Sequence, residues 1–391
     1  MPPNPFIGVI YHWIGGLAAG SFYLPFKRVR RWSWETYWLV AGVFSWLIAP
    51  TFFAVLLTRE PFKVLAEADG RTWGWGYAWG VVWGIGGLTY GLSVRYLGVS
   101  LGCAIALGLC TVFGMLMPPL FEGHFRETLW DKSSGFTVLM GLVVCVIGIA
   151  ITGLAGIGKE REMPAEQKKA TVQEFNFGLG VAVATVCGVL SAAFSYGLTA
   201  TKAIKDLSVH HGTDAIWAGL PQLIVILLGG FTTNAIWCGL LGVRNRTFGE
   251  YASTAGRPVK REDETIVETA LDMPGEEMAA RLPDASDTPG RTSGRASLVV
   301  NYTLSALAGL TWYFQFFFYT MGSSQMGKYD FSSWTLHMAS IIIFSTLWGL
   351  ALREWRGSSV RTRSLIGIGL GTLVLSTVIV GYGNYLGSTE H

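Results

Sequence analysis

The feature that most constrains this chain is the spacing of its charged residues. Cutting the sequence at every Asp, Glu, Lys and Arg leaves ten uncharged stretches of at least 22 residues. About 20 apolar residues, each rising 1.5 Å along an α-helix, cross the ~30 Å hydrocarbon core of a bilayer. Each stretch is therefore long enough to span a membrane. The stretches are 1–26, 36–58, 72–94, 96–121, 133–158, 175–201, 215–243, 296–327, 331–352 and 364–389.

The composition excludes a soluble globular protein. Only 14% of the residues are charged, against about a quarter in soluble domains, and the mean hydropathy is +0.41. A membrane β-barrel would have short segments of alternating polarity, whereas these stretches are long, continuous and rich in Leu, Val, Ile, Ala and Gly. We predict an all-α integral membrane protein with ten transmembrane helices. No basic segment precedes the first stretch, which argues against a cleaved signal peptide and for a first span.

The distribution of Lys and Arg predicts the orientation. If the N-terminus lies outside, the inner connections hold 21 of the 29 Lys and Arg residues, as the positive-inside rule requires. We therefore expect a multi-pass membrane protein with both termini outside, in the periplasm or the extracellular space. The five cysteines all fall inside the stretches and are interpreted as small packing residues.

Two features organise the chain between the spans. Residues 244–295 are rich in Pro, Gly, Ser and charged residues, which predicts a flexible inner linker. A faint repeat relates Gly16–Phe22 to Gly188–Phe194, and Leu88–Gly98 to Leu310–Gly322. Both matches pair one span with the fifth span after it, and this odd offset inverts the second half, as in many secondary transporters. We predict two inverted five-helix repeats, 1–158 and 175–391.

Few polar groups lie inside the spans. The readily titrating ones are His12 and His337, and intramembrane ionisable residues usually mark substrate or ion pathways. Both lie roughly 9 Å below the predicted outer surface, where they are expected to face one cavity. The structural alternative is a neutral histidine hydrogen-bonded between helices. Asn234 and Asn301, nearer the inner surface, are expected either to fix helix packing or to line an inner vestibule.

Aromatic and amide side chains recur near the histidines at helical spacing. Trp312, Gln315 and Tyr319 follow the pattern i, i+3, i+7, and Trp334 precedes His337 by one turn. Aromatic rings stack on the C–H faces of a sugar, whereas its hydroxyl groups need amide or imidazole partners. The pattern therefore predicts a sugar-binding site. Its predicted residues are His12, Trp83, Tyr90, Trp312, Gln315, Tyr319, Trp334 and His337.

Proton coupling is predicted at the same place. Asp330 precedes Trp334 by four residues and His337 by seven, so the three are expected to share one helical face. The helix dipole holds an N-terminal aspartate ionised, whereas a histidine needs only a small shift to titrate near neutrality. Our hypothesis is that His337 carries the proton, Asp330 stabilises the imidazolium, and His12 is a sugar ligand or second relay. Asp330 acting only as a helix cap is the alternative.

At these residues the sequence resembles the L-rhamnose/proton symporter family of the drug/metabolite transporter superfamily. The resemblance covers the chain from end to end except for the linker. Its most specific stretches are Tyr23-Leu-Pro-Phe-Lys27, Trp32-Ser-Trp-Glu-Thr36, Trp83-Gly-Ile-Gly86, Tyr90-Gly-Leu, Arg95-Tyr-Leu-Gly98, Trp312-Tyr-Phe-Gln-Phe-Phe-Phe-Tyr319, Tyr329-Asp330, Ser333-Trp334 and Leu336-His-Met338.

The resemblance implies a ten-helix fold of two inverted halves, no cofactor, and import of L-rhamnose or a related deoxysugar driven by protons. The sequence departs from the enterobacterial members at Gly87 and Leu88, where an Asn-bearing stretch is expected, and in its longer linker. The nearest alternative is an exporter of amino acids or small metabolites from the same superfamily. A membrane enzyme is not expected, because the spans lack paired carboxylates and clusters of metal ligands.

Overall fold

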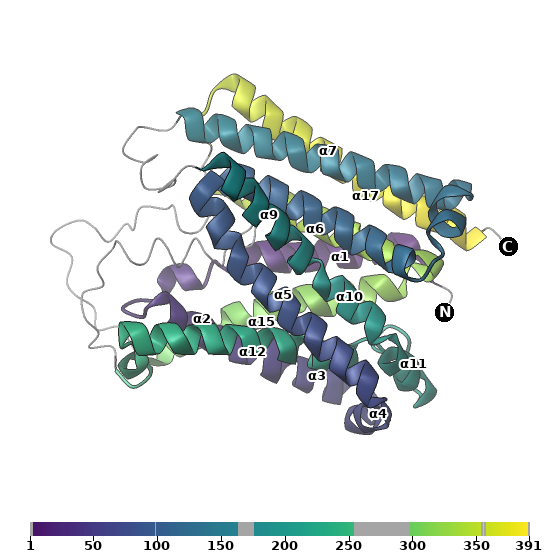
Figure 1. Ribbon diagram of the computed structural model, residues 1–391, viewed down its shortest axis with the longest axis horizontal. Helices are drawn as coiled ribbons and strands as arrows, with labels where there is room; N and C mark the ends of the chain where they lie inside the picture. Colours follow the sequence, from purple (N-terminus) through teal and green to yellow (C-terminus); the bar gives the residue numbers. More distant parts are fainter. Residues whose placement is uncertain are drawn as a thin grey trace.

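The chain folds into a bundle of long helices, seen in the computed structural model of Figure 1. The structure describes residues 3–97, 99–162, 176–253, 298–352, 355 and 357–389, and within these ranges it contains helices and no strand. The predicted all-α class is therefore confirmed. The principal helices are α1 (Pro5–Ser21), α2 (Trp34–Gly42), α3 (Ala49–Leu57), α4 (Pro61–Glu67), α5 (Gly70–Leu97), α6 (Val99–Phe121), α7 (Ser133–Glu162), α9 (Phe177–Ser191), α10 (Ala193–Ala200), α11 (Lys202–His210), α12 (Leu220–Asn245), α15 (Leu298–Ser324), α16 (Ser333–Ala351) and α17 (Val360–Thr389).

Eight helical segments of the described chain are long and apolar enough to cross a membrane. Helices α5 and α15, with 28 and 27 residues, are equally long but lie outside this set. Helix α5 is rich in Trp and Gly, and α15 contains polar residues such as Asn301 and Gln315 together with three Tyr, so their hydropathy is lower. Bulky apolar side chains such as Phe52 and Leu56 are 57% and 61% exposed. Such surfaces suit contact with lipid rather than with water.

Both chain termini lie at the same end of the bundle, called here the terminal end (Figure 1). Helices α4 and α11 also lie there. At the opposite end, the segment before α2 meets the segment after α12. There Glu250 accepts hydrogen bonds from the backbone N–H and hydroxyl of Ser33, both at 2.7 Å, and from the Thr36 hydroxyl at 2.8 Å. The first of these bonds satisfies the free backbone N–H of Ser33 at the start of α2.

Those contacts bear on the predicted linker 244–295. Most of it, residues 254–295, lies outside the described residues. Of its first ten residues, Arg244 and Asn245 complete α12, and Phe248–Tyr251 form a 3-10 helix. The side chains of Asn245 and Thr247 donate to Glu35 of α2, both at 3.0 Å. This part of the segment is therefore tied to the bundle.

Glycine-lined contacts bring the helices close together. Helix α7 packs along α17, where a Cβ at Gly148 would lie 2.9 Å from Leu373 and one at Gly383 would lie 2.7 Å from Val138. Helix α1 packs on α15 and α16 through a face of small residues around His12. Small residues allow such close approach in membranes. Helix α16, with its 3-10 turn η5 (Gly327–Ser332), is the most buried of the eight candidate spans, at 72%.

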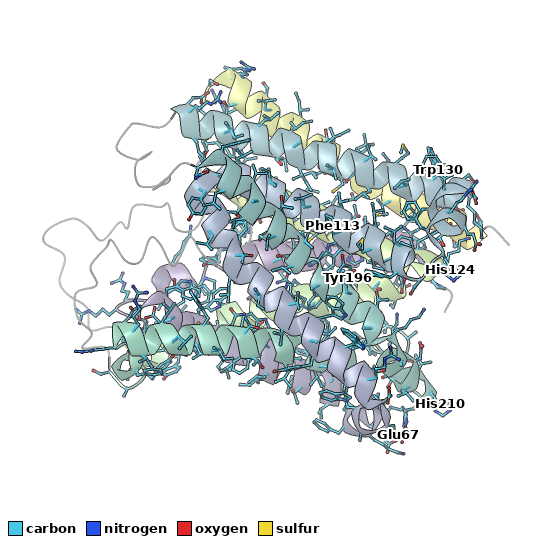
Figure 2. All side chains as sticks on the ribbon, in the orientation of Figure 1. Glu67, Phe113, His124, Trp130, Tyr196 and His210 are labelled. Atoms are coloured by element: carbon cyan, nitrogen blue, oxygen red, sulfur yellow. The ribbon has the colours of Figure 1, made fainter. Side chains whose placement is uncertain are left out.

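Two helix breaks place aromatic rings inside the bundle. Helix α1 ends at Ser21, and the break between α9 and α10 falls at Ala192. Both lie within the heptapeptides whose similarity predicted the repeat. Phe22 directly after α1 and Phe194 two residues after Ala192 are 2% and 1% exposed. Figure 2 shows how side chains fill the spaces between the helices, with Tyr196 of the broken helix near Phe113.

Candidate functional site

A small cavity lies at the centre of the bundle, between α5, α6, α9, α10, α15 and α16. Its volume is about 20 Å³, room for about one water molecule. The bundle therefore holds this site in a contracted form, and a larger ligand requires its walls to move apart. The lining residues are Trp83, Cys110, Ser191, Phe194, Trp312, Gln315, Phe316, Tyr319, Trp334, His337, Met338 and Ile341.

Helix α15 supplies the predicted stripe of this central cavity. Trp312, Gln315 and Tyr319 all line it, because residues at i, i+3 and i+7 fall on one side of a helix. The Gln315 Oε1 atom lies 3.4 Å from Nε2 of His337 on α16. The Gln315 amide nitrogen and His337 Nδ1 are buried without a hydrogen-bond partner in the described chain. These two groups of the cavity lining can therefore form hydrogen bonds with a ligand or with water.

Indole and phenyl rings form the remaining walls. The ring centroid of Phe194 lies 5.1 Å from Trp83, 4.7 Å from Phe316 and 6.1 Å from Trp334. The Trp334 indole N–H donates to the backbone oxygen of Cys110 at 2.9 Å, which fixes the ring against α6. With Trp312 and Tyr319, the walls contain three indole rings and one phenol ring. These rings surround the amide of Gln315 and the imidazole of His337.

His12 lies behind this wall rather than in it. Its side chain is fully buried, and its ring centroid is 5.3 Å from Tyr319 and 6.3 Å from His337. Gly322 makes room for the imidazole, since a Cβ there would lie 2.6 Å from Nε2. Within the described residues neither ring nitrogen of His12 has a hydrogen-bond partner. The two intramembrane histidines are brought together, but only His337 lines the central cavity.

Tyr90 also lies outside the cavity lining. It is 2% exposed, and its hydroxyl oxygen is 2.6 Å from the sulfur of Cys103 on α6. Trp83, two turns earlier on α5, does line the cavity. Of the eight predicted site residues, six therefore meet at the central cavity, while His12 and Tyr90 pack behind its walls.

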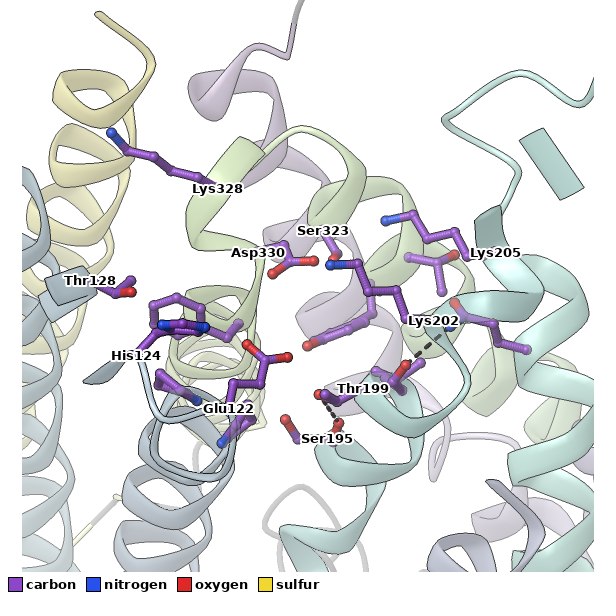
Figure 3. Close-up of a pocket in the computed structure, with 18 residues that line it drawn as sticks. Glu122, His124, Thr128, Ser195, Thr199, Lys202, Lys205, Ser323, Lys328 and Asp330 are labelled. Carbon is purple, nitrogen blue, oxygen red and sulfur yellow. Dashed lines mark hydrogen bonds between the residues drawn. The ribbon is translucent and has the colours of Figure 1, made fainter. Parts of the chain in front are cut away.

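A larger cavity, called here the vestibule, opens at the terminal end with a volume of about 250 Å³ (Figure 3). Asp330 lines it, whereas Trp334 and His337 line the central cavity. The predicted common face of these three is wrong at Asp330, because the α-helix begins at Ser333 and Asp330 lies in the 3-10 turn η5, which has three residues per turn rather than 3.6. The vestibule is lined by Pro118, Pro119, Glu122, His124, Thr128, Ser195, Leu198, Thr199, Lys202, Lys205, Gly219, Gln222, Tyr319, Thr320, Ser323, Lys328, Asp330 and Phe331.

Towards the opposite end, an aromatic layer closes the central cavity. The ring centroids of Trp312 and Phe22 lie 4.3 Å apart, and beyond them is a space of about 10 Å³ beside Trp38 and Trp46. Asn234 belongs to this layer's framework, because its Oδ1 accepts from the Trp38 indole N–H at 3.2 Å. Of the two roles expected for Asn234, these contacts support the one in helix packing.

The other asparagine predicted near this end has similar contacts. Asn301 accepts from the backbone N–H of Arg30 at 3.2 Å and donates to the Arg30 carbonyl at 2.8 Å. It holds the segment between α1 and α2 against α15.

Comparison with known proteins identifies the family. The profile of a family described as "L-rhamnose-proton symport protein" matches residues 2–255 and 287–385. The L-rhamnose-proton symporters of Cronobacter sakazakii, Klebsiella pneumoniae and Yersinia pestis are 34%, 33% and 33% identical to the chain. Each aligns over 378 residues, 96% of this chain and 97% of the relative. The chain belongs to the L-rhamnose-proton symport protein family.

Of the two predicted departures from that family, the one at Gly87 and Leu88 falls away from the central cavity. The family profile leaves out residues 256–286, inside the predicted linker. Gly87 and Leu88 are on α5 but do not line the cavity. The space beside Gly87 is open, because a Cβ added there would meet nothing within 4 Å.

Sequence reasoning missed part of the lining. Phe194, Phe316, Cys110 and Ser191 line the cavity, but as apolar or small residues inside spans they look like ordinary packing. For Phe194 one signal existed, its place in the repeated heptapeptide opposite Phe22. The vestibule was missed because its charged residues come from connections at span ends, where charges are normal.

Proposed function

We propose that this protein imports L-rhamnose, or a closely related deoxysugar, together with protons across the bacterial inner membrane. The observation that carries the proposal is the central cavity, where aromatic rings surround Gln315 and His337 in a chain of the L-rhamnose-proton symport family. Apolar ring faces, one amide and one imidazole suit an uncharged sugar, whose C–H faces stack while its hydroxyls form hydrogen bonds. No cofactor has a part in this proposal.

The proposed architecture is ten spanning helices in two inverted halves, 1–158 and 175–391. In support, α1 packs on α15 and α16, as α9 packs on α5 and α6, and α7 pairs with α17. An offset of five spans relates α1 to α9, and it relates α15 and α16 to α5 and α6. The contacts of α1 therefore correspond to those of α9, and the α7–α17 pair corresponds to itself. Gly16 of α1 abuts Ser340 of α16, as Gly188 of α9 abuts Ala106 of α6. A site between the halves is the usual outcome of such a repeat.

In the proposed orientation the terminal end faces the periplasm and the opposite end faces the cytoplasm. An even number of spans puts both termini on one side, as Figure 1 has them. The basic residues Lys27, Arg28, Arg30 and Arg31 follow α1 at the opposite end, where the positive-inside rule expects the cytoplasm.

For sugar binding we assign Trp83, Trp312, Gln315, Tyr319, Trp334 and His337 as direct contacts, with His12 and Tyr90 supporting them from behind. Gln315→Ala removes an amide whose nitrogen is buried and unpartnered in the described chain, with a loss of about 1–3 kcal/mol of hydrogen bonding. We expect sugar affinity to fall at least several-fold while the protein keeps its fold. Unchanged affinity by calorimetry would remove Gln315 from the site.

For coupling we assign the proton to His337, with His12 as its neighbour and Asp330 at the mouth of the route. His337 is the histidine that lines the central cavity, beside the predicted sugar ligand Gln315. A sugar bound there would therefore sense the charge of the imidazole. Asp330 reaches the terminal side through the vestibule, and Tyr319 lies between the two, 5.3 Å from His337 by ring centroids.

The test is L-rhamnose uptake into proteoliposomes under an imposed proton gradient. We expect accumulation that an uncoupler abolishes, and a His337→Gln variant that exchanges sugar but no longer accumulates it. Uptake by the wild-type protein that does not depend on the proton gradient would contradict proton symport. A His337→Gln protein that still concentrates sugar would leave symport intact and move the proton to another group.

A further inference from the structure

The vestibule has the size and the groups of a binding site in its own right. At about 250 Å³ it is an order of magnitude larger than the central cavity, and it approaches the ~300 Å³ lower end of small-molecule sites. In this conformation a monosaccharide therefore has room in the vestibule but none in the central cavity.

The charges around the vestibule favour an uncharged polar ligand. Lys328 of η5 lines the vestibule with its Nζ atom 5.3 Å from the Tyr329 ring centroid. Of the other charged residues, Lys202 and Lys205 enter from α11, whereas Glu122 and Asp330 enter from the end of α6 and from η5. Figure 3 shows the Asp330 carboxylate and the Lys202 ammonium directed into the cavity from different walls. None of these four forms an ion pair within 4 Å among the described residues. Separated charges of both signs can each bond a ligand hydroxyl, and such charge-assisted bonds are strong.

Neutral polar groups and rings complete the wall. Gln222 is held by bonds from its amide nitrogen to the Leu198 carbonyl at 3.1 Å and the Thr201 hydroxyl at 3.2 Å. Thr199 and Ser323 add hydroxyl groups. Tyr319 supplies an aromatic ring at the inner limit. The wall therefore combines hydrogen-bonding groups with a ring surface, as the central cavity does.

Tyr319 is the residue that the two cavities share. It lines both, is 4% exposed, and its ring is wedged between His12, His337 and Trp334 at centroid distances of 5.3, 5.3 and 6.0 Å. A ligand moving from the vestibule to the central cavity must therefore displace this ring.

We propose that the vestibule is a second binding site for the same neutral, hydroxyl-rich ligand, and that Tyr319 is the partition between the two sites. The inference rests on the proposed transport function. It adds that the sugar is bound twice in succession, first among Lys202, Lys205, Glu122 and Asp330 and then beside Gln315 and His337.

The first test probes occupancy of the vestibule in the purified full chain. The native cysteines are all buried, so Thr199→Cys adds one accessible thiol whose reaction with a charged thiol reagent is measured against the unchanged chain. L-Rhamnose should slow this reaction at least three-fold, and sucrose at equal osmolarity should not. The slowing should persist in Thr199→Cys/Gln315→Ala, where the central site is impaired. Absence of protection, or its loss with Gln315→Ala, would overturn the second site.

The second test probes the partition without any sugar. Cys110 lines the central cavity, so its thiol reports access to that cavity. Tyr319→Ala should speed its modification at least ten-fold, Tyr319→Phe should not, and Cys110→Ala should remove the signal. Tyr382→Ala, on the exposed side of α17, is the matched control. An unchanged rate in Tyr319→Ala would overturn the partition.

The two proposals fail in different ways. A protein that never accumulates rhamnose in proteoliposomes, yet shows Tyr319-dependent access to Cys110, refutes symport and keeps the partition. Gradient-driven accumulation combined with an unprotected Thr199→Cys thiol refutes the second site and keeps symport.

Discussion

Gly114 of α6 leaves room for the Trp334 ring because it has no side chain. A Cβ at this position would overlap the indole nitrogen and would lie 2.7 Å from its Cε2 atom. Ordinary carbon contacts are about 3.5 Å or longer, so Gly114→Ala must push the ring by about 0.8 Å or more. The adjacent open space is the central cavity, and the indole bond to the Cys110 carbonyl would be lost.

The expected cost follows from these two effects. Overpacking costs about 1–3 kcal/mol and the lost hydrogen bond about 1 kcal/mol, which together give roughly 2–4 kcal/mol. Thermal unfolding in detergent, followed by intrinsic fluorescence, should show a lower Tm. Because the ring then protrudes into a cavity with room for one water molecule, L-rhamnose affinity should fall at least ten-fold, which corresponds to about 1.4 kcal/mol.

Gly108→Ala is the matched control on the same helix. A Cβ at Gly108 meets nothing within 4 Å, and alanine is the better helix former by about 1 kcal/mol. This variant should keep or slightly raise the Tm and leave sugar affinity unchanged. If Gly114→Ala behaves like Gly108→Ala in both measurements, the position assigned to Trp334 is wrong.

Two further predictions concern packing at the two ends. His211 lies 2.7 Å from Glu67 and 3.2 Å from Glu60. The hydrogen bond to Glu67, and after it the one to Glu60, raises the pKa of His211. The same bond to His211 lowers the pKa of Glu60. The Tm advantage of wild type over His211→Gln should therefore be present near pH 6, decline as pH rises through the raised pKa of His211, and also decline when acid protonates Glu60; a pH-independent difference would contradict this. Asn234→Leu leaves the buried Trp38 indole N–H unsatisfied, so stability should fall by about 1–3 kcal/mol with sugar affinity retained, and equal thermal unfolding would argue against the bond.

The sequence predicted the helices well because their signal is the absence of charge over 22 or more residues. Helices occupy all ten uncharged stretches. Helical spacing also predicted that Trp312, Gln315 and Tyr319 line one cavity. What failed depended on local geometry, as at Asp330, which lies in a 3-10 turn and lines the vestibule, whereas Trp334 and His337 line the central cavity.

Other parts of the site depended on tertiary packing, which the spacing of residues within one helix cannot encode. His12 was predicted to lie at the same depth as His337, yet it packs behind the cavity wall, where Gly322 makes room for its ring. Tyr90 shares a helix with Trp83, but it faces Cys103 of α6 instead of the cavity. The vestibule gathers side chains from helices α6, α10, α11, α12 and α15 and from the turn η5, among other segments, so its existence follows only from the fold.

The low hydropathy of α5 and α15 has a consequence for how the protein is made. These helices carry Trp83, Trp312, Gln315 and Tyr319, and neither belongs to the eight apolar segments. A segment leaving the translocon partitions into lipid according to its summed transfer free energy, so α5 and α15 gain least from entering the bilayer alone. In the proposed ten-span architecture, we therefore expect their insertion to rely on helices that are already in the bilayer, such as α1 and α2, which α15 contacts. We therefore expect the residues proposed to recognise the sugar to make insertion of α15 depend on helices that precede it in the chain.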